Sequence, residues 1–131
     1  MADKLSKEAL EQRCVHIFES MARVEDNHNA TVGKLADARS ELKAASAKKA
    51  VACCKLGAAA TKPENDSALE EVMAATKAED AARDVVAELE EETRFFSNAL
   101  RREQRSYCAA VQELEEHKAD TDTSTRWMYG Y

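Results

Sequence analysis

The sequence predicts an all-α protein folded as one long antiparallel helical hairpin, a two-helix coiled coil. Strong helix formers fill the 131 residues, and glycine and proline together number only four. Charged residues make up 34% of the chain and aromatic residues only 5%. The β-branched runs bounded by turn residues that indicate strands are absent from the sequence. We therefore expect a single elongated helical domain over 1–131 with a thin core.

The first helix is predicted over about 4–57, because its apolar positions advance by alternating steps of three and four residues. This spacing is typical of a heptad seam, which is the stripe that faces a partner helix in a coiled coil. Polar residues interrupt the stripe, so it is not a uniform zipper. The predicted seam positions are Leu10, Cys14, Ile17, Met21, Val24, His28, Thr31, Leu35, Ala38, Leu42, Ala45, Lys49, Ala52 and Leu56.

The second helix is predicted over about 67–119, with a seam of the same spacing. An aromatic tail over 120–131 follows it, because "ADTDTSTR" is rich in threonine and aspartate and is expected to fray the helix. The predicted seam positions are Val72, Ala75, Glu79, Ala82, Val86, Leu89, Thr93, Phe96, Leu100, Glu103, Tyr107, Ala110, Leu114 and His117.

The stretch "GAAATKPENDSALEE" contains the chain's only proline and separates the two seams. Gly57 suits a helix C-terminus, and Pro63 opposes continuation of the first helix. Ser67 and Glu70 match the S-x-x-E capping box of a new helix, so a turn over 58–66 is predicted. At 1.5 Å per residue, each helix would be ~80 Å long, and equal lengths allow the two to pair along their whole extent.

An alternative arrangement has three shorter helices. It requires the first helix to break within "DNHNATVG", residues 26–33, where asparagine, histidine and glycine weaken helical propensity.

Charge favours the antiparallel hairpin. Residues 34–62 carry seven Lys or Arg against two acids, whereas residues 64–92 carry eleven acids against two bases. Folding at the turn lays the basic stretch beside the acidic one. Exposed pairs contribute only ~0.2–1 kcal/mol each, so this complementarity sets register and direction more than stability.

All seven aromatic residues lie at or before position 18 or at or after position 95. A hairpin places these two regions at the same end, and aromatic side chains are the strongest anchors of interfaces. We expect a dimer or partner interface there, with local closure of the hairpin end as the alternative. The candidate interface residues are Ile17, Phe18, Met21, Phe95, Phe96, Leu100, Tyr107 and Trp127.

Four cysteines, Cys14, Cys53, Cys54 and Cys108, show neither a C-x-x-C pair nor a histidine at ligand spacing, so no metal is expected. A fold centred near residue 62 pairs positions that sum to about 123, which places Cys14 near Cys108. Packed reduced thiols are the expected state in a cytosolic protein, and a cross-helix disulfide is the alternative.

A longer pattern gives the chain a family resemblance. The basic helix "KLADARSELKAASAKKAVACCKL" precedes a short Lys/Pro loop, the acidic helix "ALEEVMAATKAEDAARDVVAELEEETRFF" and then "ALRREQRSYCAAVQELEEH". Over roughly 10–129 this resembles the second and third helices of a BAR domain, most closely the sorting-nexin type found in retromer-associated nexins. A BAR arm has three helices, whereas this pattern gives two unless the first one breaks.

The resemblance implies a crescent-shaped homodimer that binds curved, phosphoinositide-containing endosomal membranes through lysines. The membrane-binding residues carried over by position are Lys43, Lys48, Lys49, Lys55 and Lys62. Several lysines on one face would contribute about 1 kcal/mol each near an anionic leaflet. The alternative is that they are solvated or paired with the acids of the second helix, and Lys49 falls on the seam. The net charge of −6 confines any lipid contact to a local patch.

Two function hypotheses follow. The first is a non-enzymatic BAR-like scaffold in endosomal protein sorting, and the second is a structural coiled-coil subunit of a cytoskeletal or tethering complex without lipid contact. The expected partner is a second copy or another long-helix protein. No apolar run of about 18 residues or secretory signal occurs, so a cytoplasmic protein, peripheral on endosomes under the first hypothesis, is expected.

Catalysis, cofactors and nucleic acid are not expected. The histidines, His16, His28 and His117, are far apart on rods, and a two-helix rod offers no walled pocket for a small-molecule substrate. "RREQR", residues 101–105, is the densest basic cluster, but it lacks interleaved aromatics and a nucleic-acid-binding motif.

Overall fold

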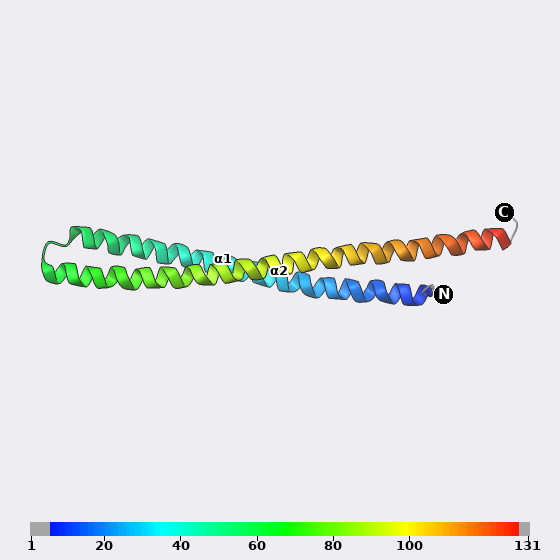
Figure 1. Cartoon of the computed structure of the whole chain (residues 1–131), viewed down its shortest axis with the longest axis horizontal. Helices are drawn as coiled ribbons and strands as arrows, with labels where there is room; N and C mark the ends of the chain where they lie inside the picture. The colour runs from blue at the N-terminus through cyan, green and yellow to red at the C-terminus, as the bar shows by residue number, and fades with distance from the viewer. Residues whose placement is uncertain (1–5, 129–131) are drawn as a thin grey trace. The chain divides into compact units, whose positions relative to one another are not determined.

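The computed structural model describes the backbone of residues 6–128 and the side chains of residues 6–119. Two helices, α1 (Lys7–Ala58) and α2 (Lys62–Met128), pack against each other as a hairpin joined by a three-residue turn (Figure 1). The all-α hairpin prediction is therefore confirmed. No strand occurs in the described part of the chain.

The chain folds into two compact units. The terminal unit comprises Met1–His28 and Phe96–Tyr131, and the turn unit comprises Asn29–Phe95. In each unit a segment of α1 pairs with a segment of α2.

The heptad seam is confirmed in both helices, because every predicted seam position is buried or half-buried. A cluster of buried apolar residues lies in the turn unit, where Leu35, Ala38 and Val86 pack together with the partly buried Leu42 and Leu89 against them. No large side chain among the described residues is completely buried. The core is therefore one side chain thick, as expected for two helices without a third layer.

Helix α1 is continuous through 26–33, so the three-helix alternative is wrong. The seam carries on across this stretch, with His28 half-buried and Thr31 and Leu35 buried, and no proline interrupts the backbone ladder. The propensity cost of the asparagines and Gly33 is spread over a helix of 52 residues. Packing along the seam outweighs this local weakness.

Within 26–33, Gly33 is the residue that lowers the stability of helix α1 most. A methyl group added at Gly33 would meet no atom within 4 Å, and the position is exposed. We expect Gly33→Ala to raise the free energy of unfolding by about 0.5–1 kcal/mol, measured by urea denaturation, because alanine loses less backbone entropy. A decrease would contradict a helical conformation at Gly33. Gly57→Ala, one residue before the end of α1, is the control and should have a smaller effect.

The ends of the turn differ from the prediction. Helix α2 begins at Lys62 instead of near 67, so Ser67 and Glu70 are not its cap. Thr61 caps the helix: its Oγ1 accepts a hydrogen bond from the Glu64 N–H at 3.4 Å, and its carbonyl accepts one from the Asn65 N–H at 2.9 Å. The Glu64 carboxylate accepts a hydrogen bond from the Ala60 N–H at 3.1 Å. "TKPE" is thus the capping sequence, and Pro63 lies in the first turn, where its missing donor costs little.

This difference gives a direct test of the turn. Thr61→Ala should lower the free energy of unfolding by about 1 kcal/mol, the usual loss for a removed N-cap. Ser67→Ala should have almost no effect, because Ser67 is an exposed position inside α2. Thermal unfolding followed by circular dichroism measures both. The reverse order of effects would restore Ser67 as the cap.

Helix α2 also continues past the predicted end near 119, as far as Met128, so the predicted tail over 120–131 is wrong up to that residue. Threonine and aspartate have only moderate helix penalties, and no glycine or proline occurs between Pro63 and Gly130. Tyr129 and Tyr131 lie outside the described residues. At the other end, Ser6 caps α1, because its Oγ accepts a hydrogen bond from the Ala9 N–H at 3.2 Å.

Candidate interaction surfaces

Charged pairs cross the seam in the turn unit as the charge pattern predicted. Basic residues of α1 meet acidic residues of α2 at Arg39–Glu90 (3.4 Å), Lys49–Glu79 (3.4 Å) and Lys55–Glu71 (3.6 Å). In heptad notation with Cys14 and Val72 at a positions, Arg39 and Glu90 are both e residues, whereas Lys55 and Glu71 are both g residues. One side of the turn-unit hairpin therefore carries the e positions of both helices, and the other side carries the g positions of both.

The register differs slightly from the prediction. Residues in contact sum to between 125, for Phe18 with Tyr107, and 129, for Arg39 with Glu90, instead of about 123. All four cysteines are free, with Cys14 half-buried on the seam and Cys108 exposed. Cys108 occupies an exposed, outward b position next to the seam residue Tyr107, so it is not packed within the seam.

The buried polar site of the turn unit is centred on Glu79. Its side chain is only 5% exposed and lies within ion-pair distance of Lys49 at 3.4 Å and Arg83 at 3.0 Å. A hydrogen bond from Ser46 is the main cause that lowers the Glu79 pKa below its ordinary value of 4.5. Burial acts in the opposite direction, and the hydrogen bond and charge of Lys49 and the charge of Arg83 lower the pKa further. Glu79 is thus an ionised, satisfied carboxylate inside the seam.

The five predicted membrane-binding lysines do not share one face. Lys43 is an exposed b residue, and Lys48 and Lys55 are exposed g residues on the other flank. Lys49 is 34% exposed and pairs with Glu79 inside the seam. Lys62, the first residue of α2, is exposed next to the turn.

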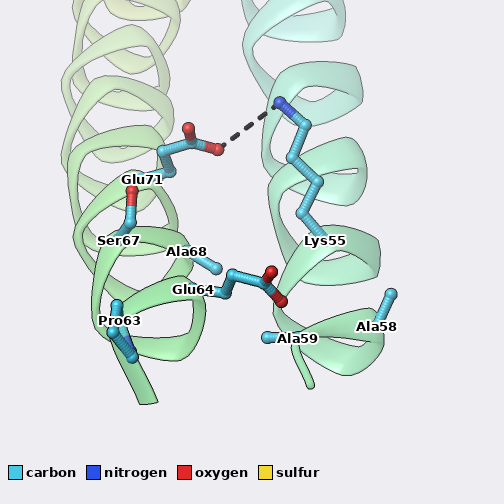
Figure 2. A pocket seen from close by; sticks show the side chains of 8 residues that line it. All are labelled: Lys55, Ala58, Ala59, Pro63, Glu64, Ser67, Ala68 and Glu71. Carbon is cyan, nitrogen blue, oxygen red and sulfur yellow. Dashed lines mark ion pairs between the residues drawn. The ribbon is translucent and has the colours of Figure 1, made fainter. Parts of the chain in front are cut away.

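The turn itself borders an open hollow of about 520 Å³. Figure 2 shows the Lys55–Glu71 ion pair spanning α1 and α2, with Pro63 and Glu64 on the turn side of it. A neighbouring hollow of about 480 Å³ contains Lys48, Val51 and Ala74. Acidic residues therefore accompany the lysines on this flank. Both hollows are open to solvent and are not enclosed pockets.

Most of the predicted interface residues lie on the seam and pack within the hairpin. These half-buried residues are Ile17, Met21, Phe96, Leu100 and Tyr107. Phe18 is 54% exposed although its ring contacts Tyr107 at a centroid distance of 5.9 Å. Phe95 is 61% exposed and belongs to the turn unit. The side chain of Trp127 lies outside the described residues.

Phe18 belongs to an apolar strip that the heptad analysis did not identify. Val15, 55% exposed, and Phe18 occupy b and e positions of α1, and the half-buried Val111 is an e residue of α2. The strip, called here the terminal flank, consists of Val15, Phe18, Ala22, Cys108 and Val111. The b and e positions form a second, shorter apolar row in the sequence beside the a and d row, and this row is the signal that identifies the strip.

The remaining features set limits on chemistry. No helix in the part of the chain that the structure describes has the length and apolar character needed to cross a membrane. Residues 6–119 contain no cluster of three or more histidine, cysteine or acidic residues arranged to hold a metal ion.

Comparison with protein-family models, curated proteins and solved structures gives no match to this chain.

Proposed function

We propose that this chain is a non-enzymatic structural subunit of a helical assembly, whose hairpin holds a further helical chain against the terminal flank. One observation carries the proposal: Val15 and Phe18 expose more than half of their surface directly beside the seam. Large apolar side chains grouped at the edge of a coiled-coil seam are typical of a helix-packing surface. The thin core of the hairpin supports the same conclusion, because a further helical layer would increase the apolar area removed from water.

Removing the flank tests this function without damaging the hairpin. Val15→Ser/Phe18→Ser should reduce the associated mass, measured by light scattering over a range of concentrations. The variant's free energy of unfolding at low concentration should fall by no more than about 1.5 kcal/mol, the contribution of the Phe18–Tyr107 ring contact, because Val15 and Phe18 are both more than half exposed. Met73→Ser is the matched control, since Met73 is 65% exposed but belongs to the turn unit. Equal association of the wild type and the flank variant would refute the proposed surface.

A BAR-like scaffold on curved, phosphoinositide-containing endosomal membranes is the second candidate. The observation that favours it is a short strip in which the exposed Val51 lies between Lys48 and Lys55 on one flank. Cations beside an apolar side chain suit the surface of an anionic leaflet. The ion pairs of Lys49 and Lys55 and the separate position of Lys43 favour the structural role over this one.

Sedimentation with liposomes separates the two functions. The membrane role requires pelleting with anionic vesicles, loss of pelleting in Lys55→Glu/Lys62→Glu, and retention in the control Lys34→Glu/Lys77→Glu. The structural role predicts that neither the wild type nor either variant pellets at moderate salt.

A further inference from the structure

The charged residues beside the terminal flank are segregated between the two helices. Over residues 7–28 of α1, the b, e and f positions carry five acids and no Lys, Arg or His. These acids, called here the α1 rim, are Glu8, Glu11, Glu19, Glu25 and Asp26. The bases of the same segment lie at a, c and g positions instead and are Lys7, Arg13 and Arg23. The edge of the flank that α1 forms is therefore uniformly acidic.

The edge formed by α2 has the opposite sign. Over residues 96–119, its b, e and f positions carry three bases and one acid. This set, called here the α2 rim, is Arg101, Arg105, Glu115 and Lys118. All nine rim residues are exposed, and none forms an ion pair with another described residue. Arg13 and Glu113, which pair at 3.0 Å, are g residues on the opposite side of the hairpin. The rim charges are thus not neutralised within the described chain.

We infer that the chain that covers the terminal flank is an amphipathic helix of a different protein, with an apolar row and a row of Lys or Arg along the edge beside α1. This inference rests on the proposed structural function and names the chemistry of the partner. The apolar row packs on Val15, Phe18 and Val111, while the cationic groups approach the acids of the α1 rim. The apolar contacts supply the area removed from water, and the charges select the partner.

A second copy of this chain is a poorer occupant of the flank. Six acids against three bases leave the two rims with a net charge of −3. Pairing of two copies through this flank brings two such surfaces together, so the copies repel each other at low salt. Self-association is therefore expected at high concentration and should strengthen as salt screens the repulsion. A cationic helix should show the opposite salt dependence, and it competes with self-association because both cover the same apolar residues.

Two synthetic peptides test the sign of the partner's charge. Each has three heptads with leucine at a and d, glutamine at e and alanine at b, c and f, and position g is lysine in the Lys-edge peptide and glutamate in the Glu-edge peptide. Because only one edge is charged, each peptide can turn that edge toward α1 by its direction along the flank. At low salt, the Lys-edge peptide should bind the monomeric wild-type chain at least about tenfold more tightly, measured by fluorescence anisotropy of the labelled peptide. Added salt should weaken this binding.

Charge reversal on the α1 rim tests where the Lys-edge peptide binds. Glu11→Lys/Glu25→Lys changes two exposed e positions on either side of Phe18. It should weaken binding of the Lys-edge peptide by about tenfold or more and tighten binding of the Glu-edge peptide. Asp84→Lys/Glu91→Lys, an equal charge change at exposed positions of the turn unit, is the control and should leave both affinities unchanged.

Two further measurements locate the peptide on the apolar strip. Val15→Ser/Phe18→Ser should weaken binding of both peptides, because the leucine row loses its contacts. Saturating Lys-edge peptide should slow alkylation of Cys108 in the wild-type chain, whereas Cys53 and Cys54 of the turn unit should react at an unchanged rate.

The outcomes separate this inference from the proposed function. Equal affinity for the two peptides, or Lys-edge binding that survives Val15→Ser/Phe18→Ser, would overturn the cationic partner. If the Lys-edge peptide did not bind while self-association still depended on Val15 and Phe18, the inference would fail and the structural function would stand, with a second copy as the occupant. If neither peptide bound and the flank substitutions left association unchanged, both the inference and the proposed function would fail.

Discussion

Leu35→Ala should lower the free energy of unfolding by about 2–5 kcal/mol, the range for a buried leucine truncated to alanine. Leu35 is 6% exposed and belongs to the only cluster of buried apolar residues identified in the described chain, with Ala38 and Val86. Its neighbours across the seam are held by long helices, so they can close only part of the space that the truncation leaves. In a core one side chain thick, no second layer compensates for the loss.

Urea denaturation at neutral pH measures the effect. Val51→Ala is the control, because Val51 is 56% exposed and its truncation should cost about 0.5 kcal/mol or less. Comparable losses at positions 35 and 51 would contradict the assignment of Leu35 to the seam.

Removal of Glu79 should also destabilise the hairpin strongly. In Glu79→Ala, the half-buried Lys49 loses its carboxylate partner, and Ser46 and Arg83 lose the same acceptor. Breaking one side of a buried pair leaves the other charge without compensation. We expect a larger loss of stability than from Glu90→Ala, which breaks a pair whose side chains are 60% and 43% exposed. Lys49→Met/Glu79→Leu, which removes both charges, should recover stability.

The same carboxylate makes stability depend on pH. Its folded pKa is below 4.5, so the unfolded chain binds the proton more readily than the folded one. The stabilisation is therefore present above pH 4.5 and is lost as the pH falls through the lower, folded pKa. Thermal unfolding between pH 6 and pH 3 should show a steeper decline for the wild type than for Lys49→Met/Glu79→Leu. Parallel curves would contradict an ionised Glu79 in the folded seam.

The heptad pattern was sufficient to predict the two helices and the seam residues that pack where the helices meet. Steps of three and four place residues on one side of a helix whatever their polarity, so Lys49, Glu79 and His28 were assigned to the seam together with the leucines. Local sequence was less informative at the turn. "TKPE" and "SALE" both fit a capping box, and only the folded backbone decides between Thr61 and Ser67.

The surfaces were less predictable than the seam. Lysines that lie close together in sequence are distributed between the two flanks and the seam by the helical period, so a basic run does not give a basic face. The positions of the aromatic residues predicted a partner interface in the terminal unit. Most of the aromatic and large apolar residues of this unit instead pack within the hairpin. The exposed strip depends on b and e positions of two segments about 90 residues apart, which become neighbours only through the register of the fold.

The reactivity of Cys108 in the wild-type chain tests the central claim, that the terminal flank is covered by association. Cys108 is exposed on this flank, whereas the exposed Cys53 and Cys54 lie in the turn unit and act as internal controls. Alkylation followed by mass spectrometry, at rising protein concentration, should show protection of Cys108 while Cys53 and Cys54 react at an unchanged rate. Equal reactivity of Cys108 at every concentration, or parallel protection of all three thiols, would contradict the claim.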